Sequence, residues 1–105
     1  MDYKIVWTNT ALADLHDLVR YIEADNQLAA NRMGELIIRK VDILVSSPRV
    51  GRMVPEYRDD LLRELIVSPY RLVYELNDLK HTASVLRIWH GARGELDMQL
   101  SLIHI

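Results

Sequence analysis

The chain has 105 residues, which fits one domain and is too short for two. Apolar residues make up 50% of it and charged residues 27%, a composition that excludes an intrinsically disordered chain. The chain contains no cysteine, and this excludes disulfides, thiolate zinc sites and cysteine nucleophiles. The formal net charge is −2, which argues against tight, charge-driven binding to free nucleic acid.

The N-terminal residues contain no apolar stretch as long as that of a signal peptide. Apolar runs in the rest of the chain are two or three residues long, far too short to span a membrane. We therefore expect a cytoplasmic protein that does not act at a membrane.

β-branched and aromatic residues dominate residues 3–7 (YKIVW), which predicts a short strand. Any of the three polar residues at 8–10 can cap a following helix. Apolar residues then recur at helical spacing over residues 12–22, and this predicts a first helix. The Asp25-Asn26 pair ends the pattern.

A second helix is predicted over residues 27–45, and it ends before a proline because the preceding residue avoids helical angles. Residues 48–61 contain prolines, a glycine and many charges, and are predicted to form a loop. Three strands follow, at residues 62–67, 70–76 and 83–89.

This order predicts an α+β fold, β-α-α-β-β-β, with a helical hairpin packed on one antiparallel sheet. We assign residues 1–99 to a single domain. Residues 100–105 have two interpretations. The alternation of apolar residues predicts part of a strand, whereas a non-native tail is indicated because DNA that resembles the transposon end used in sequencing libraries would encode these six residues. We expect the tail.

Three residues of the C-terminal half have side chains suited to RNA cleavage. Glu56 lies in the loop predicted over residues 48–61, which we call the long loop. Arg71 lies in a strand, and His90 ends the last strand. Glutamate and histidine can transfer protons, and arginine can stabilise the charge of a phosphate. Each also has an ordinary structural explanation: a solvated loop charge, an arginine paired with a neighbouring carboxylate, and a histidine at a strand end.

Sequence motifs for metal or cofactor binding are missing. No two histidines have the spacing of metal ligands on one helix face. There is no phosphate-binding loop and no dinucleotide fingerprint. We therefore expect neither a metal ion nor a cofactor.

Several short motifs follow one another between residues 3 and 94. They are Trp7 with Ala11-x-x-Asp14-Leu15, Tyr21-Ile22, Pro48-x-x-Gly51-Arg52, Arg63-Glu64-Leu65, Tyr70-Arg71-Leu72-Val73-Tyr74 and Leu86-Arg87-Ile88-Trp89-His90-Gly91-Ala92-Arg93. In order and spacing the chain resembles the RelE/ParE superfamily of toxins from type II toxin–antitoxin modules. The β-α-α-β-β-β fold of that family agrees with the element order predicted from periodicity.

The resemblance implies a cognate antitoxin whose extended or helical segment wraps the toxin and blocks it. It also implies one of two activities. RelE-like members enter the ribosomal A site and cut mRNA, whereas ParE-like members block DNA gyrase and cut nothing.

For a ribosome-dependent nuclease, the resemblance implies Glu56 as base, Arg71 as phosphate clamp and His90 as acid. It implies that Arg52, Arg63 and Arg93 contact phosphate or the target.

The net charge of −2 and the residues that make up the motifs, which resemble those of ParE-like chains, favour a ParE-like toxin that inhibits gyrase by protein–protein binding. The alternative is a RelE-like, metal-independent endoribonuclease that cuts mRNA on the ribosome. A further alternative is an inactive relative that keeps only its antitoxin-binding function.

Overall fold

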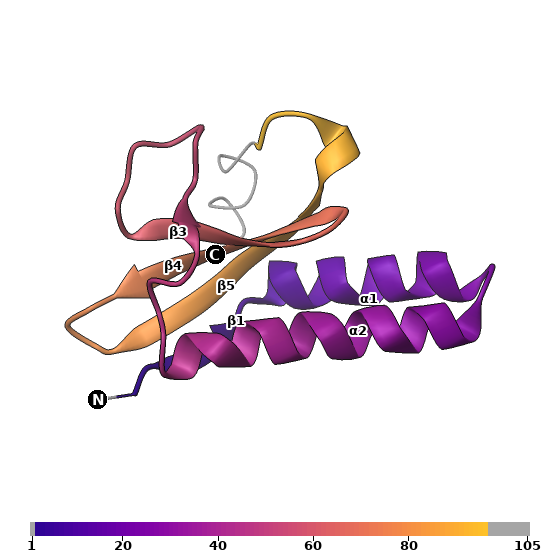
Figure 1. Ribbon diagram of the computed structural model, residues 1–105, viewed down its shortest axis with the longest axis horizontal. Coiled ribbons are helices and arrows are strands. Elements are labelled where there is room, and N and C mark those ends of the chain that lie inside the picture. Colours follow the sequence, from indigo (N-terminus) through magenta and orange to yellow (C-terminus); the bar gives the residue numbers. More distant parts are fainter. Residues whose placement is uncertain (1, 97–105) are drawn as a thin grey trace.

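The computed structural model describes residues 2–96 (Figure 1). In chain order its elements are β1 (Lys4–Trp7), α1 (Asn9–Glu23), α2 (Gln27–Asp42), the 3₁₀ helix η1 (Ile43–Val45), β2 (Arg52–Met53), β3 (Leu62–Val67), β4 (Tyr70–Asn77), β5 (Thr82–His90) and the 3₁₀ helix η2 (Gly91–Arg93). This order confirms the predicted α+β class, both helices and the four predicted strands. The expected tail at residues 100–105 lies outside the described residues.

Both helices begin at a polar cap. The Thr8 hydroxyl accepts a hydrogen bond from the Ala11 N–H at 3.1 Å and donates to the Val85 carbonyl at 2.8 Å. The Asn26 side chain accepts from the Ala29 N–H at 3.0 Å. Such caps satisfy amides that have no partner within the helix. Within residues 2–96, neither helix is long and apolar enough to cross a membrane.

The five strands form one sheet in the order β1-β5-β4-β3-β2. Strands β2 to β5 pair antiparallel, but β1 pairs parallel with β5. The prediction of a wholly antiparallel sheet is therefore wrong at β1. Short turns force antiparallel pairing between neighbours, whereas the long connection from β1 to β5 passes through both helices and permits a parallel pair.

Strand β2 is a second difference, because residues 48–61 were predicted to be loop throughout. Arg52 pairs with Glu64, and Met53 pairs with Arg63. This pairing attaches the start of the long loop to β3. A two-residue strand has no periodicity that a sequence can show.

The two helices lie side by side along one face of the sheet (Figure 1). The main core lies between the two helices and the sheet. It includes Ile37 and Val41 of α2 together with Leu72 and Tyr74 of β4. A smaller cluster, which we call the second core, lies on the helix-free face. It consists of Val54, Leu62, Val73, Leu86, Trp89 and Leu96. Strand β4 serves both cores because successive side chains of a strand point to opposite faces.

Candidate functional site

The helix-free face of the sheet carries a cluster of four charged side chains. Glu64 of β3 lies at its centre, and its side chain is wholly buried (0% exposed). One Glu64 oxygen accepts a hydrogen bond from Nε of Arg52, and the other accepts from Nε of Arg71, both at 2.6 Å. A buried carboxylate requires such charge-assisted bonds, because an unpaired buried charge is very costly. Glu64 therefore holds one arginine on each side.

Arg71 links this buried carboxylate to the loop residue Glu56. The two terminal nitrogens of Arg71 donate to the two carboxylate oxygens of Glu56, each at 2.7 Å. The planar guanidinium matches a carboxylate in this end-on geometry. The side chains are largely buried, with 14% of Arg71 and 18% of Glu56 exposed. All three guanidinium nitrogens of Arg71 are thus bound to carboxylates of its own chain.

This pairing fixes the charge of Glu56. Hydrogen bonds from Arg71 lower the pKa of Glu56 from its ordinary 4.5 to about 2, and they outweigh burial, which acts in the opposite direction. The same bonds raise the pKa of the Arg71 guanidinium. Glu56 is therefore a carboxylate throughout the physiological pH range.

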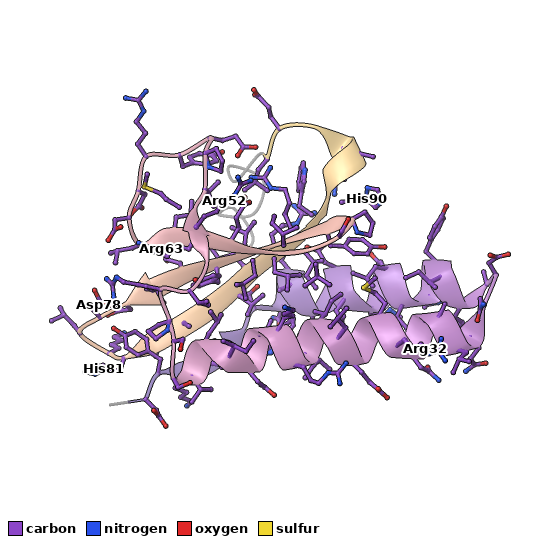
Figure 2. The ribbon with its side chains drawn as sticks, in the orientation of Figure 1. Arg32, Arg52, Arg63, Asp78, His81 and His90 are labelled. Carbon is purple, nitrogen blue, oxygen red and sulfur yellow. The ribbon has the colours of Figure 1, made fainter. Side chains whose placement is uncertain are left out.

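A shallow recess of about 440 Å³ opens over this cluster. Its lining residues are Arg52, Pro55, Glu56, Arg71 and Glu95. Two guanidiniums and two carboxylates face the recess, so their formal charges cancel. Only the Arg52 side chain is widely exposed among the cluster's paired charges, at 61%, and Figure 2 shows it above the sheet near the long loop. The recess has no surplus positive charge to attract a polyanion.

His90 lies apart from Glu56 and Arg71. It pairs with Tyr70 across β4 and β5, whereas Arg71 pairs with Trp89. Because neighbours in a strand point to opposite faces, His90 and Arg71 lie on opposite sides of the sheet. The His90 ring contacts the Tyr70 ring edge-on with centroids 5.3 Å apart, and Figure 2 shows His90 beside η2.

A second recess, of about 480 Å³, lies between α1 and the end of β5, where β1 no longer covers the strand edge. His90, Tyr21, Tyr70 and Arg93 are among its lining residues. The His90 Nδ1 accepts a hydrogen bond from the Ala92 N–H at 3.0 Å, so this nitrogen caps η2.

The remaining two predicted arginines have separate surroundings. Arg63 donates to the Asp60 carboxylate at 2.6 Å and to the Gly51 carbonyl at 2.8 Å. It therefore ties the two ends of the long loop together. The Arg93 guanidinium lies 4.0 Å from the centroid of the Trp89 ring, a cation–π contact. Of the six predicted site residues, Arg52, Glu56 and Arg71 meet in one recess, and His90 and Arg93 share the other.

Comparison with known proteins identifies the family. A family model described as the ParE toxin of the type II toxin–antitoxin system parDE matches residues 5–94. The chain belongs to the ParE toxin family. The toxin is therefore a component of a type II toxin–antitoxin system, in the RelE/ParE superfamily, as the motifs predict.

Relatives of this ParE-family toxin carry names from both branches of the superfamily. Toxin RelE2 of Caulobacter vibrioides is 39% identical over 92 residues, which cover 86% of this chain and 97% of that protein. The toxin–antitoxin complex RelBE2 of Mycobacterium tuberculosis contains a chain with 26% identity and a TM-score of 0.64, with 86% of this chain and 99% of that chain covered.

Two further solved structures share the fold. A chain of the chromosomal ParDE system from P. aeruginosa has a TM-score of 0.68 at 21% identity, with 84% of this chain and 95% of that chain covered. A mutant of the E. coli toxin RelE in the free state has a TM-score of 0.65 at 18% identity, with 99% of this chain and 94% of that chain covered.

Glu64 is a residue of this site in the ParE-family toxin that was not among the six predicted from the sequence. The sequence feature that could have indicated it is its position in β3 (LRELIV), where Glu64 shares one strand face with Leu62 and Ile66. A carboxylate among apolar residues of one strand face needs a cationic partner.

Among residues 2–96, no group of His, Asp and Glu side chains is arranged to hold a metal ion.

Proposed function

We propose that this ParE-family toxin inhibits DNA gyrase through protein–protein binding and does not cut mRNA. The observation that supports this most is the bidentate Arg71–Glu56 pair, with Arg–carboxylate distances of 2.7 Å. It occupies the two residues that a nuclease would need as phosphate clamp and base.

Glu56 is a poor general base in this pairing. A base works best when its pKa lies near the working pH, and Arg71 holds the pKa of Glu56 at about 2. Both of its oxygens already accept hydrogen bonds. A substrate hydroxyl would find a carboxylate that already accepts three hydrogen bonds and is only weakly basic.

His90 is also poorly placed to act together with Glu56 and Arg71. An acid and a base that act on one phosphate must both reach it. His90 is on the helix side of the sheet with Tyr70, and Arg71 is on the other side with Trp89. A phosphate bound at Arg71 would therefore lie on the other face of the sheet from the His90 side chain.

Protein binding, in contrast, agrees with the surface. The net charge is −2, and a protein–protein contact does not need a basic face. The second recess presents Tyr21, whose residue is 81% exposed, beside Tyr70 and Arg93. Tyrosine and arginine are enriched at the centres of protein interfaces. An antitoxin partner follows from the same module, because the matched solved structures include toxin–antitoxin assemblies.

The second candidate function is mRNA cleavage on the ribosome. It is favoured by the 39% identity to a protein named Toxin RelE2. The two functions make opposite predictions about which synthesis stops first in a growing cell.

The test is pulse labelling after tightly controlled induction in a bacterial host. We expect thymidine incorporation to fall within the first minutes while amino-acid incorporation continues. We also expect purified toxin to block supercoiling by purified gyrase. If amino-acid incorporation stops first and gyrase is unaffected, gyrase inhibition is the wrong function.

His90→Ala gives a matched second test, with His16→Ala as its control because the His16 side chain is exposed on α1. Loss of a general acid lowers a rate about 10²-fold or more. We expect His90→Ala to leave mRNA integrity on translating ribosomes the same as wild type, since neither protein cleaves. Cleavage by wild type that disappears in His90→Ala but persists in His16→Ala would establish the nuclease.

A further inference from the structure

Residues 94–96, which follow η2 and which we call the C-terminal segment, cover the second core without forming a strand. Leu96 is only 4% exposed and packs within the second core. The Trp89 indole N–H donates to the Gly94 carbonyl at 3.2 Å, and the Tyr57 hydroxyl lies 3.5 Å from the Leu96 carbonyl. The segment is therefore held by hydrogen bonds between its own backbone and side chains of the sheet and the long loop, and by the packing of the Leu96 side chain.

One carboxylate joins this segment to the rest of the molecule. The Leu96 N–H donates to Glu56 Oε2 at 2.7 Å. The same oxygen accepts from Arg71 at 2.7 Å. Glu56 thus connects the long loop, strand β4 and the C-terminal segment, which are far apart in the sequence. Removal of this carboxylate would take away a hydrogen bond to the segment and the bonds that join the loop to Arg71.

The residues beneath the segment would become exposed if it moved away. Leu96 and Val54, which come from outside the strands around Trp89, help to enclose Val73 and Trp89 of the sheet. The main core contains no residue from the long loop or from positions 94–96. The helices can therefore stay packed on the sheet while the opposite face opens. Figure 1 shows the two covering segments on the side of the sheet away from the helices.

We propose that Glu56 is a latch that controls access to the helix-free face of the sheet. In the closed form its carboxylate bridges Arg71 and the Leu96 amide, and the second core is covered. In the open form the segment at 94–96 leaves, and Trp89 and Val73 become accessible while the main core is intact. This device is independent of whether gyrase or the ribosome is the target.

The test is amide hydrogen exchange by NMR in the full chain carrying Glu56→Gln. Glutamine keeps the size but loses the charge, and a hydrogen bond to a charged group is stronger than one to a neutral group. We expect the protection of the Leu96 amide to fall at least about tenfold. The protection of the Val41 amide in α2 should stay within about twofold.

Glu95→Gln is the matched control. It removes the same charge from an adjacent, exposed residue that lines the recess. Leu96 protection, corrected for the intrinsic exchange rate, should then match wild type. An unchanged Leu96 amide in Glu56→Gln, or an equal loss at Leu96 and Val41, would overturn the latch.

Trypsin provides a second readout, since it cleaves after Arg93 at the start of the segment. We expect cleavage there to be about tenfold faster in Glu56→Gln than in wild type, because the two proteins have the same sequence around Arg93. Leu96→Ala loosens the segment from its apolar end and should accelerate the same cleavage with Glu56 intact. Equal cleavage in wild type, Glu56→Gln and Leu96→Ala would contradict the proposal.

Discussion

At the scale of single residues, Glu64 and Glu56 show how burial converts charges into structure. Glu64 is wholly buried between two guanidiniums, and Glu56 is mostly buried against Arg71. Removing one partner from such a pair leaves an uncompensated charge and costs about 3–5 kcal/mol. These residues therefore hold β2, β3, β4 and the long loop together, whatever else they do.

The depressed pKa of Glu56 leads to a prediction about pH. Its folded pKa, about 2, is below the ordinary 4.5, so its contribution is fully present above about pH 4.5. That contribution is lost as pH falls through the folded value, and it is on the order of 3 kcal/mol. Urea denaturation should show wild type losing its advantage over Glu56→Gln between about pH 4.5 and pH 2. A difference that does not change with pH would contradict the pairing.

At the scale of secondary structure elements, two glycines differ in the space around them. Gly34 lies within α2, and a Cβ added there would meet a Val19 methyl group at an ordinary 3.5 Å. Gly51 lies just before β2, where a Cβ would come within 2.5 Å of the Glu64 carbonyl and 2.6 Å of the Tyr74 hydroxyl. The Gly51 N–H also donates to that hydroxyl at 3.0 Å. The long loop can reach β3 only because position 51 has no side chain.

Alanine at these two positions should shift stability in opposite directions. Gly34→Ala should raise the free energy of unfolding by up to about 1 kcal/mol, because alanine is the better helix former. Gly51→Ala should lower it by about 1–3 kcal/mol, because the new methyl group forces backbone or the Tyr74 ring to move. Thermal denaturation followed by circular dichroism measures both. Shifts of the same sign would show that the packing at one position is described wrongly.

At the scale of the whole molecule, one sheet separates two cores of unequal size. Ile37 is fully buried in the main core, where the helices and the sheet surround it. Leu96 is buried in the second core, close to the end of the described chain. A cavity in the main core cannot collapse easily, whereas the segment that carries Leu96 is the part that the proposed latch releases.

Truncating each residue should reveal this asymmetry. Ile37→Ala should lower the free energy of unfolding by about 2–5 kcal/mol, through lost transfer energy and the cavity left behind. Leu96→Ala should fall below that range, because the site can relax. Chemical denaturation followed by far-ultraviolet circular dichroism gives both values. An equal cost at the two positions would mean that the terminal segment is as firmly held as the main core.

Much of the fold could be predicted because periodicity is a local property. Helical spacing located α1 and α2, and β-branched runs located the longer strands. Alternation along β4 also put Arg71 and Val73 on the face opposite Leu72 and Tyr74, as the two cores confirm. The family followed from motif order, and the match over residues 5–94 confirms it.

Local patterns and motifs were therefore sufficient for the α+β class, the helices, the longer strands and the toxin family. Three features depend on how distant segments pack: β1 runs parallel to β5, Glu64 joins Arg52 to Arg71, and His90 lies across the sheet from Glu56. A pattern of neighbouring residues records which face a side chain takes. It does not record which distant segment comes to lie against that face, because long-range pairing is chosen by the packing energy of the whole chain.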